Sequence, residues 1–88
     1  MIERTVTIRN KAGLHTRPAA AVVRLAAQYQ SEFFIQKDGF EINGKSIIGV
    51  MTLAAERGSS LKLLFDGPDE EQAANAIAEL FDAGFGEP

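Results

Sequence analysis

The sequence predicts an α+β fold, an open-faced sandwich in which a four-stranded antiparallel sheet carries two long helices and one short helix on one face. Stretches of alternating apolar and polar residues predict strands, and stretches with apolar residues every three or four positions predict helices. The two kinds of stretch follow one another in the order β-α-β-β-α-β-α, which is typical of this fold class. The length suits one compact domain, which we expect to span residues 1–88.

The first two elements are expected to be a strand and a long helix. The apolar positions of the strand, which alternate with polar ones, are Ile2, Val6 and Ile8. Thr16 is a preferred N-cap residue for the helix, and Pro18 then falls in the first turn, where a missing N–H costs nothing. The apolar stripe of the helix is expected to contain Val22, Leu25, Ala26 and Tyr29.

The middle of the chain predicts a hairpin and a short helix. The strand segments 33–35 and 40–42 flank Asp38 and Gly39, a pair that strongly favours a two-residue hairpin turn. A short helix is expected around residues 47–53.

The last strand and the last helix follow a turn at residues 58–60. Residues 61–65 predict the strand. The acidic segment 68–71 predicts the start of a helix, and Gly84 is expected to end that helix. The buried stripe of this helix is expected to contain Ala74, Ile77, Leu80 and Phe81. We expect the tail, residues 85–88, to be loosely held.

The connections between these elements predict the strand order. A right-handed crossover through the first helix leaves a slot between the first two strands, and the last strand can fill it in the antiparallel direction. The sheet order is therefore expected to be 1-4-2-3.

Composition limits the classes of function. The chain has no cysteine and a single histidine, which excludes disulfides and thiol chemistry, and we expect neither a metal nor another cofactor. No secretory leader pattern or membrane-spanning apolar run is visible, so we expect a cytoplasmic protein with no membrane contact.

Charge is distributed unevenly along the chain. Residues 1–45 hold seven Lys and Arg against four Asp and Glu, a net +3, whereas residues 46–88 hold two against eight, a net −6. A basic region on an acidic protein favours docking to acidic protein partners. It argues against nucleic-acid binding, which favours a basic domain.

The histidine, His15, lies in the segment Gly13–Ala20 at the start of the first predicted helix. Free N–H groups and the positive end of the helix dipole make such a position a ready anion site. A neutral imidazole keeps one nitrogen lone pair free to take up and pass on a phosphoryl group. Arg17 supplies a charged fork for phosphate oxygens, and Thr16 either caps the helix or contacts the phosphoryl group. Each feature alone is common on protein surfaces; together they predict a phosphoryl carrier.

The segment Gly13–Ala20 resembles the active-site signature of HPr, the histidine-containing phosphocarrier family of the bacterial sugar phosphotransferase system. The segment Asn43–Met51 resembles that family's regulatory-serine signature. The similarity continues through Gly58 and residues 67–70 to the last helix, so it covers essentially the whole chain. The resemblance implies the same fold and the same strand order.

The resemblance also implies roles for individual residues. His15 would accept phosphate on Nδ1 from enzyme I, itself charged by phosphoenolpyruvate, and hand it to an enzyme IIA domain. The chain would then be a carrier rather than an enzyme, and we expect it to be a monomer. Arg17 would adjust around the phosphoryl group, and Ser46 matches the position that an HPr kinase/phosphorylase modifies in many members. The partner-binding surface would comprise Leu14, Ala20, Arg24, Ile47, Ile48 and Met51.

Two local features have alternative interpretations. Ser46 is of a type that caps helices, with or without regulatory phosphorylation. Ile47, Ile48 and Met51 have core-like helical spacing, but they exceed what one buried face of a short helix needs. We therefore expect Ile47 or Ile48 to be partly exposed.

Three alternative functions differ in how well the residues fit them. One is a carrier in the paralogous nitrogen-regulatory phosphorelay, which uses the same histidine. A more distant one is an acylphosphatase-like hydrolase, whose glycine-rich anion loop is absent here. An RNA- or metal-binding module lacks the aromatic-basic strand motifs or the ligands that it needs.

Overall fold

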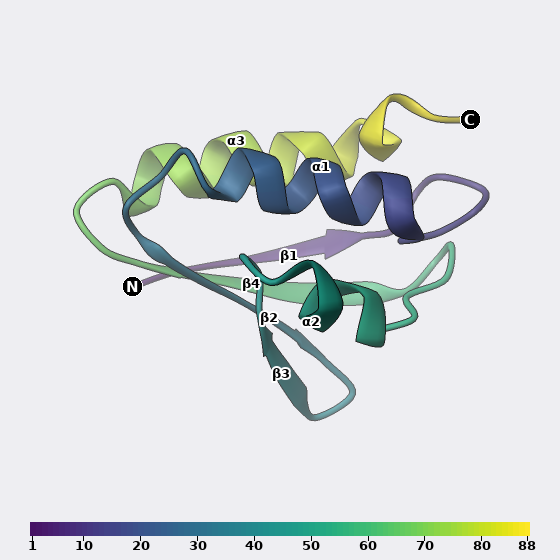
Figure 1. The fold of residues 1–88 in the computed structure, drawn as a ribbon, viewed down its shortest axis with the longest axis horizontal. Coiled ribbons are helices and arrows are strands. Elements are labelled where there is room, and N and C mark those ends of the chain that lie inside the picture. The colour runs from purple at the N-terminus through teal and green to yellow at the C-terminus, as the bar shows by residue number, and fades with distance from the viewer.

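The computed structural model describes residues 1–88 and has the expected α+β architecture (Figure 1). Its elements are β1 (Ile2–Thr7), α1 (Thr16–Ala26), β2 (Glu32–Lys37), β3 (Phe40–Asn43), α2 (Ile47–Thr52), β4 (Ser60–Asp66) and α3 (Glu70–Asp82), followed by a short 3-10 turn at Gly84–Gly86. The sheet order is β1-β4-β2-β3, and every neighbouring pair is antiparallel. The predicted fold class and strand order are confirmed.

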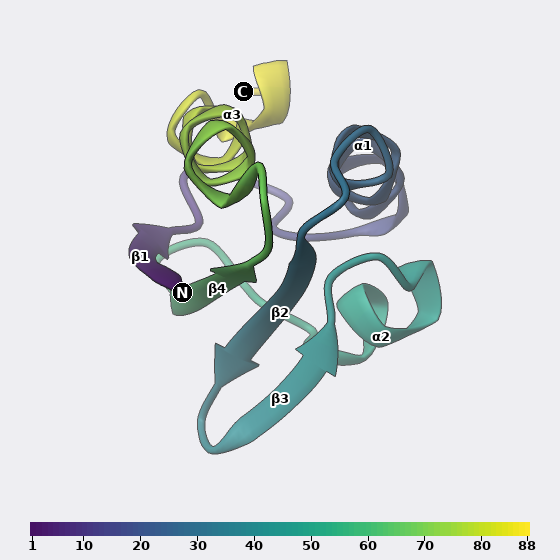
Figure 2. The same ribbon diagram turned by 90° about the vertical axis from the view of Figure 1, so that its left-hand side faces the viewer.

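The helices form one layer over one face of the sheet. In Figure 2, α1 and α3 lie next to each other above the strands, and α2 lies beside the β2–β3 hairpin. Helix α3 contacts β1 and β4, whereas α1 contacts both α2 and α3. Along β1, Val6 is buried while Glu3, Thr5 and Thr7 are exposed, so alternation separates the core face from the open face.

One hydrophobic core holds the two layers together. Phe33 of β2 stacks on Phe65 of β4 with ring centroids 4.8 Å apart, and both rings are buried. Ile77 and Phe81 of α3 are completely buried in the same core, as predicted for its apolar stripe. Leu80 differs because it is only half-buried at the edge of that stripe.

The hairpin turn forms as expected. Asp38 and Gly39 both have left-handed backbone angles, with φ of 50° and 84°. A two-residue type I′ turn requires positive φ at both positions, which Asp and Gly adopt readily. Lys37 therefore pairs with Phe40 at the end of the β2–β3 ladder.

The boundaries of the first two elements differ slightly from expectation. Ile8 lies just beyond β1, although it is as buried as a core strand residue. Helix α1 ends at Ala26, so Tyr29 packs against the core from the following turn. More importantly, His15 is the N-cap of α1 and Thr16 is its first helical residue, so the first of the two roles left open for Thr16, capping the helix, is excluded.

The expectation of a loosely held C-terminal tail is also wrong. Phe85 packs edge-on against Phe81 with ring centroids 5.0 Å apart. The N–H of Lys11 donates to the carbonyl of Pro88 at 2.8 Å. Asn10 Nδ2 donates to the Glu87 carboxylate at 2.9 Å. Long-range contacts therefore hold a segment whose local sequence has little preference for order.

None of the helices has the length and apolar character needed to cross a lipid bilayer.

Candidate functional site

The loop before α1 presents the imidazole of His15 at the surface. The N–H of Leu14 donates to Ala55 O at 2.9 Å, and Leu14 itself is buried in the core. Gly13 has φ of 76°, and a Cβ at this position would lie only 2.7 Å from Ala55 O. Glycine is therefore required for the close approach that anchors Leu14. With Leu14 pointing inward, His15 begins the helix with its side chain 43% exposed.

The first turn of α1 offers a small set of free donors beside His15. The His15 carbonyl accepts the N–H of Ala19 at 2.9 Å, which begins the helical hydrogen-bond pattern. The N–H groups of the preceding residues have no acceptor within the helix, and Pro18 has no N–H at all. The donors in the first turn are therefore the amides of Thr16 and Arg17, at the positive end of the helix dipole.

A carboxylate from the far end of the chain contacts His15. Glu87 Oε1 and Oε2 lie 3.0 and 3.2 Å from His15 Nε2. Asn10 is buried and joins this carboxylate to the loop, because its Nδ2 also donates to Gly13 O at 2.7 Å. The hydrogen bond with His15, followed by the one from Asn10, holds the pKa of Glu87 below its ordinary value, and the positive charge of Arg17 adds to the effect.

Sequence reasoning did not identify Glu87, which is 72 residues from His15. The one local signal is a single acidic residue between glycine and proline in the tail. That signal does not show where the tail lies, because its position depends on hydrogen bonds to Asn10 and Lys11, which are far away in the sequence.

Two open hollows flank His15. The first, of about 590 Å³, brings Arg17 and Glu87 together with His15. Its lining comprises Lys11, Ala12, His15, Arg17, Glu87 and Pro88. The second, of about 500 Å³, runs from His15 and Thr16 to Met51 of α2 and includes Arg57. The phosphoryl-acceptor candidate and α2 therefore belong to one continuous surface.

Helix α2 exposes three large apolar side chains. Ile47, Ile48 and Met51 are 38%, 75% and 42% exposed, as expected for side chains that exceed what the core needs. On α1, Ala20 is half-buried and Arg24 is exposed. Leu14 differs, because it is only 4% exposed and belongs to the core. The anchoring of the loop turns Leu14 inward, so it supplies little exposed surface, although it lines the hollow between His15 and Met51.

Ser46 occupies the N-cap of α2. Its Oγ accepts the N–H of Gly49 at 3.2 Å, which is a normal capping bond for serine. Ser46 is half-buried, next to the exposed Ile47. The structure therefore shows the capping role, and it places Ser46 directly before the exposed apolar residues of α2.

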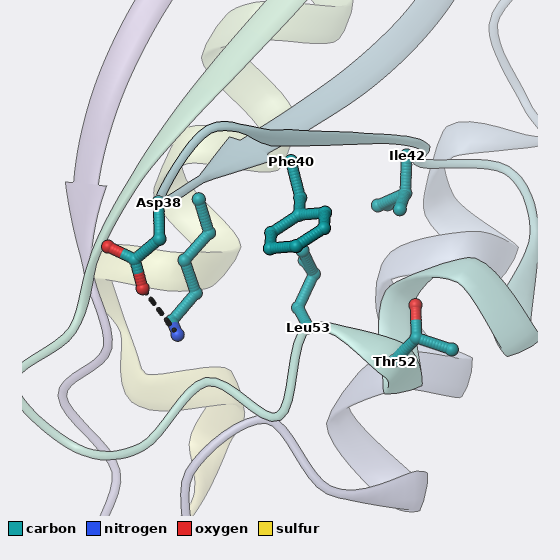
Figure 3. Close-up of a pocket in the computed structure, with 6 residues that line it drawn as sticks. Asp38, Phe40, Ile42, Thr52 and Leu53 are labelled. Carbon is teal, nitrogen blue, oxygen red and sulfur yellow. Dashed lines mark hydrogen bonds and ion pairs between the residues drawn. The ribbon is translucent and has the colours of Figure 1, made fainter.

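A third hollow lies apart from this site, between the β2–β3 hairpin and the end of α2 (Figure 3). It measures about 310 Å³, and Phe40, which is 72% exposed, is one of the residues that line it. Lys37 Nζ and the Asp38 carboxylate form an ion pair of 3.0 Å at one side. This hollow shares no lining residue with the two hollows that flank His15.

Comparison with known proteins agrees with this geometry. The family model described as the PTS HPr component phosphorylation site matches residues 2–83. The chain belongs to the HPr family. Phosphocarrier protein HPr of Treponema pallidum (strain Nichols) is 45% identical over 87 residues, covering 99% of each chain.

Solved HPr structures share the fold. The crystal structure of HPr-C-His from Thermoanaerobacter tengcongensis has a TM-score of 0.96 at 43% identity, covering 100% of this chain and 99% of that one. An HPr dimer from the same organism has a TM-score of 0.79 at 44% identity, covering 99% of this chain and 100% of that one. The predicted family is confirmed, and membership makes the chain a phosphocarrier component of the phosphotransferase system.

Proposed function

We propose that His15 accepts a phosphoryl group from enzyme I charged by phosphoenolpyruvate and passes it to enzyme IIA domains. The observation that carries this proposal is the position of His15 as the exposed N-cap of α1. A phosphoryl group on the ring lies next to the free amides of Thr16 and Arg17, which suit a dianion. The Arg17 guanidinium, which lines the same hollow, adds a charged donor pair. A contact from the Thr16 hydroxyl is part of the same proposal.

The test is transfer in a purified system. The protein is incubated with phosphoenolpyruvate and enzyme I, and one added phosphoryl group is expected that is labile in acid and stable in base. His15→Ala should abolish this signal and still fold, because the side chain is exposed. Arg17→Ala should slow transfer without preventing folding. An acid-labile phosphate on His15→Ala would contradict the assignment.

The same assay separates the two carrier branches. Efficient phosphorylation by enzyme I of the sugar system supports the sugar-transport role. Efficient phosphorylation only by the paralogous enzyme of the nitrogen-regulatory relay would place the chain in that branch instead. A hydrolase would release phosphate continuously rather than retain one equivalent.

We propose that α2 is the centre of the docking surface for both partners. Its exposed isoleucines and Met51 form an apolar patch at the end of the hollow that begins at His15. Met51 suits contacts with more than one protein, because a thioether repacks easily. Arg24 and Ala20 extend this surface along α1, and the basic charge near His15 favours acidic partners.

We propose that phosphorylation of Ser46 by an HPr kinase/phosphorylase regulates this docking. A phosphate there adds about two negative charges at the start of α2. Those charges stand beside Ile47, so a partner that covers the patch must desolvate them. Incubation with such a kinase and ATP should add a single acid-stable phosphate, which Ser46→Ala removes.

We also infer that the chain acts as a monomer. Its large exposed apolar side chains, apart from Met1 and Phe40, are those of α2, where partner proteins are proposed to bind. Light scattering on the purified protein tests this inference, and a dimer comparable to that of the Thermoanaerobacter tengcongensis relative would contradict it.

A further inference from the structure

We propose that Glu87 is a positioning residue that fixes the proton of the neutral His15 ring on Nε2 and so reserves Nδ1 as the nucleophile. This inference rests on the proposed role of His15 as phosphoryl acceptor. Its basis is the contact of both Glu87 carboxylate oxygens with Nε2, at 3.0 and 3.2 Å.

The chemistry of the contact assigns the proton. An ionised carboxylate only accepts hydrogen bonds, so the ring nitrogen that faces it must carry hydrogen. In a neutral imidazole, the other nitrogen then holds the free lone pair. No protein group is hydrogen-bonded to Nδ1 of His15. Nδ1 is bonded to Cγ and so lies nearer the main chain of His15, where the first-turn amides begin.

The Glu87 carboxylate is held in place from several directions. Its side chain is 15% exposed, compared with 43% for His15. Asn10 binds the same oxygen that lies closest to Nε2. Phe85 and Pro88 fix the tail on either side through the contact with Phe81 and the hydrogen bond from Lys11. A carboxylate restrained in this way loses little side-chain freedom when it holds the ring.

The same contact assists the transfer step. The Nδ1 lone pair forms a bond to phosphorus while the bond from phosphorus to the leaving group of phosphorylated enzyme I breaks, and that leaving group keeps the electron pair. The ring proton remains on Nε2, so the ring becomes positively charged and Glu87 stabilises it. When the phosphoryl group moves on, the N–P electron pair returns to Nδ1 and the neutral Nε2–H ring is restored.

The carboxylate also repels an incoming dianion, and distance decides between the two effects. Coulomb interactions weaken with separation and are screened further at an exposed site. Glu87 acts on the ring at hydrogen-bond distance, whereas the phosphoryl group binds the nitrogen on the other side of Cε1. Lys11 and Arg17 line the same hollow and offset part of the repulsion. Stabilisation of the ring therefore outweighs repulsion of the phosphate.

The experiment combines a spectroscopic measurement with a rate. His15 is the only histidine, so its ring nitrogens give one set of ¹⁵N signals. At a pH where the ring is neutral, the intact protein should show a protonated Nε2 and an unprotonated Nδ1. Glu87→Ala should move both signals toward the averaged values of an exchanging imidazole. Phosphorylation by enzyme I, measured under single-turnover conditions, should become about fivefold slower, the scale of a half-exposed ion pair.

Two further variants isolate the cause. Glu87→Gln keeps an acceptor oxygen without the charge, so it should retain most of the tautomer signal and an intermediate rate. Glu79→Ala removes one negative charge from an exposed position of α3 and should change neither measurement.

Three results would overturn the proposal: unchanged ring signals in Glu87→Ala, an unchanged rate, or a faster rate. A faster rate would mean that the tail inhibits phosphorylation of His15. Failure of the intact protein to accept phosphate would instead overturn the proposed function, and the ring signals would still report whether Glu87 sets the tautomer.

Discussion

Gly44 precedes the regulatory-serine candidate and tests how tightly the core is packed beneath it. A Cβ added at Gly44 would lie 2.2 and 2.3 Å from Cδ2 and Cε2 of Phe33, whereas real contacts stay beyond 3.0 Å. Phe33 has little freedom to move, because it is 2% exposed and stacked on Phe65. The Gly44 N–H also donates to the Phe33 carbonyl at 2.7 Å, so the backbone is fixed to the strand that carries the ring.

These contacts set the expected cost of Gly44→Ala. Overpacking a close-packed core costs about 1–3 kcal/mol, and a clash with a stacked ring belongs at the upper end of that range. Alanine also leaves the unfolded chain less conformational freedom than glycine does, which stabilises the folded state by about 0.5–1 kcal/mol. We therefore expect the free energy of unfolding to fall by about 2 kcal/mol. With a urea m-value of about 1 kcal/mol/M for a small domain, the midpoint should fall by about 2 M.

Urea unfolding followed by circular dichroism measures this change. Gly58→Ala is the matched control, because its φ is 90° but nothing lies within 4 Å of the added Cβ. That variant has the same effect on the unfolded chain and adds left-handed strain without a clash, so its net cost should not exceed about 1 kcal/mol. A Gly44→Ala protein as stable as Gly58→Ala would refute the clash as the dominant effect.

Other predictions concern the cap of α2, its exposed face and acid stability. Ser46→Ala should lower the free energy of unfolding by about 1 kcal/mol through loss of the bond to Gly49, whereas Ser46→Asp should restore much of it in the same urea titration. Ile48→Ser should weaken enzyme I binding, measured by calorimetry, with little change in stability, because the side chain is 75% exposed. The Ser31 hydroxyl, followed by the Gln30 N–H, holds the pKa of Asp69 below its ordinary value. The contribution of the Asp69 carboxylate to the free energy of unfolding should therefore be complete above the unfolded-state pKa of Asp69. It should disappear as the pH falls through the lower pKa of Asp69 in the folded state. Asp69→Asn should flatten this part of the acid dependence of the urea midpoint.

Local sequence signals predicted most of the fold because they coincide with what tertiary packing requires. Asp38 and Gly39 form the expected turn, since the positive φ values that the turn needs are intrinsic to those residue types. The apolar stripe of α3 is buried because its period matches the helix. The start of α1 was off by one residue because Thr16 is the better cap by side-chain type. The backbone is extended at His15 instead, after Leu14 has been anchored to Ala55.

The site was predictable only where its residues are neighbours in the sequence. His15 and Arg17 belong to one short motif, so their proximity follows from the start of the helix. Leu14 belongs to the same motif, but its orientation depends on a backbone contact with a distant loop. Glu87 reaches His15 only because the turn that follows α3, at Gly84, lies close to Asn10, which also binds the carboxylate. Hydrophobic periodicity and secondary-structure propensity predict single helices and strands. Neither predicts which distant segments of the chain come into contact.

The open geometry around His15 fits the proposed role of a carrier better than that of a catalyst. A phosphoryl group that must pass between two proteins has to be reachable by each in turn. His15 is exposed, and the chain supplies two amides and one guanidinium around it. Such a site stabilises a dianion without enclosing it, so a partner bound over α2 must exclude water and complete the charge balance. If the proposed role is right, transfer should be fast only inside a complex, and the free carrier should keep its phosphoryl group until the next partner docks.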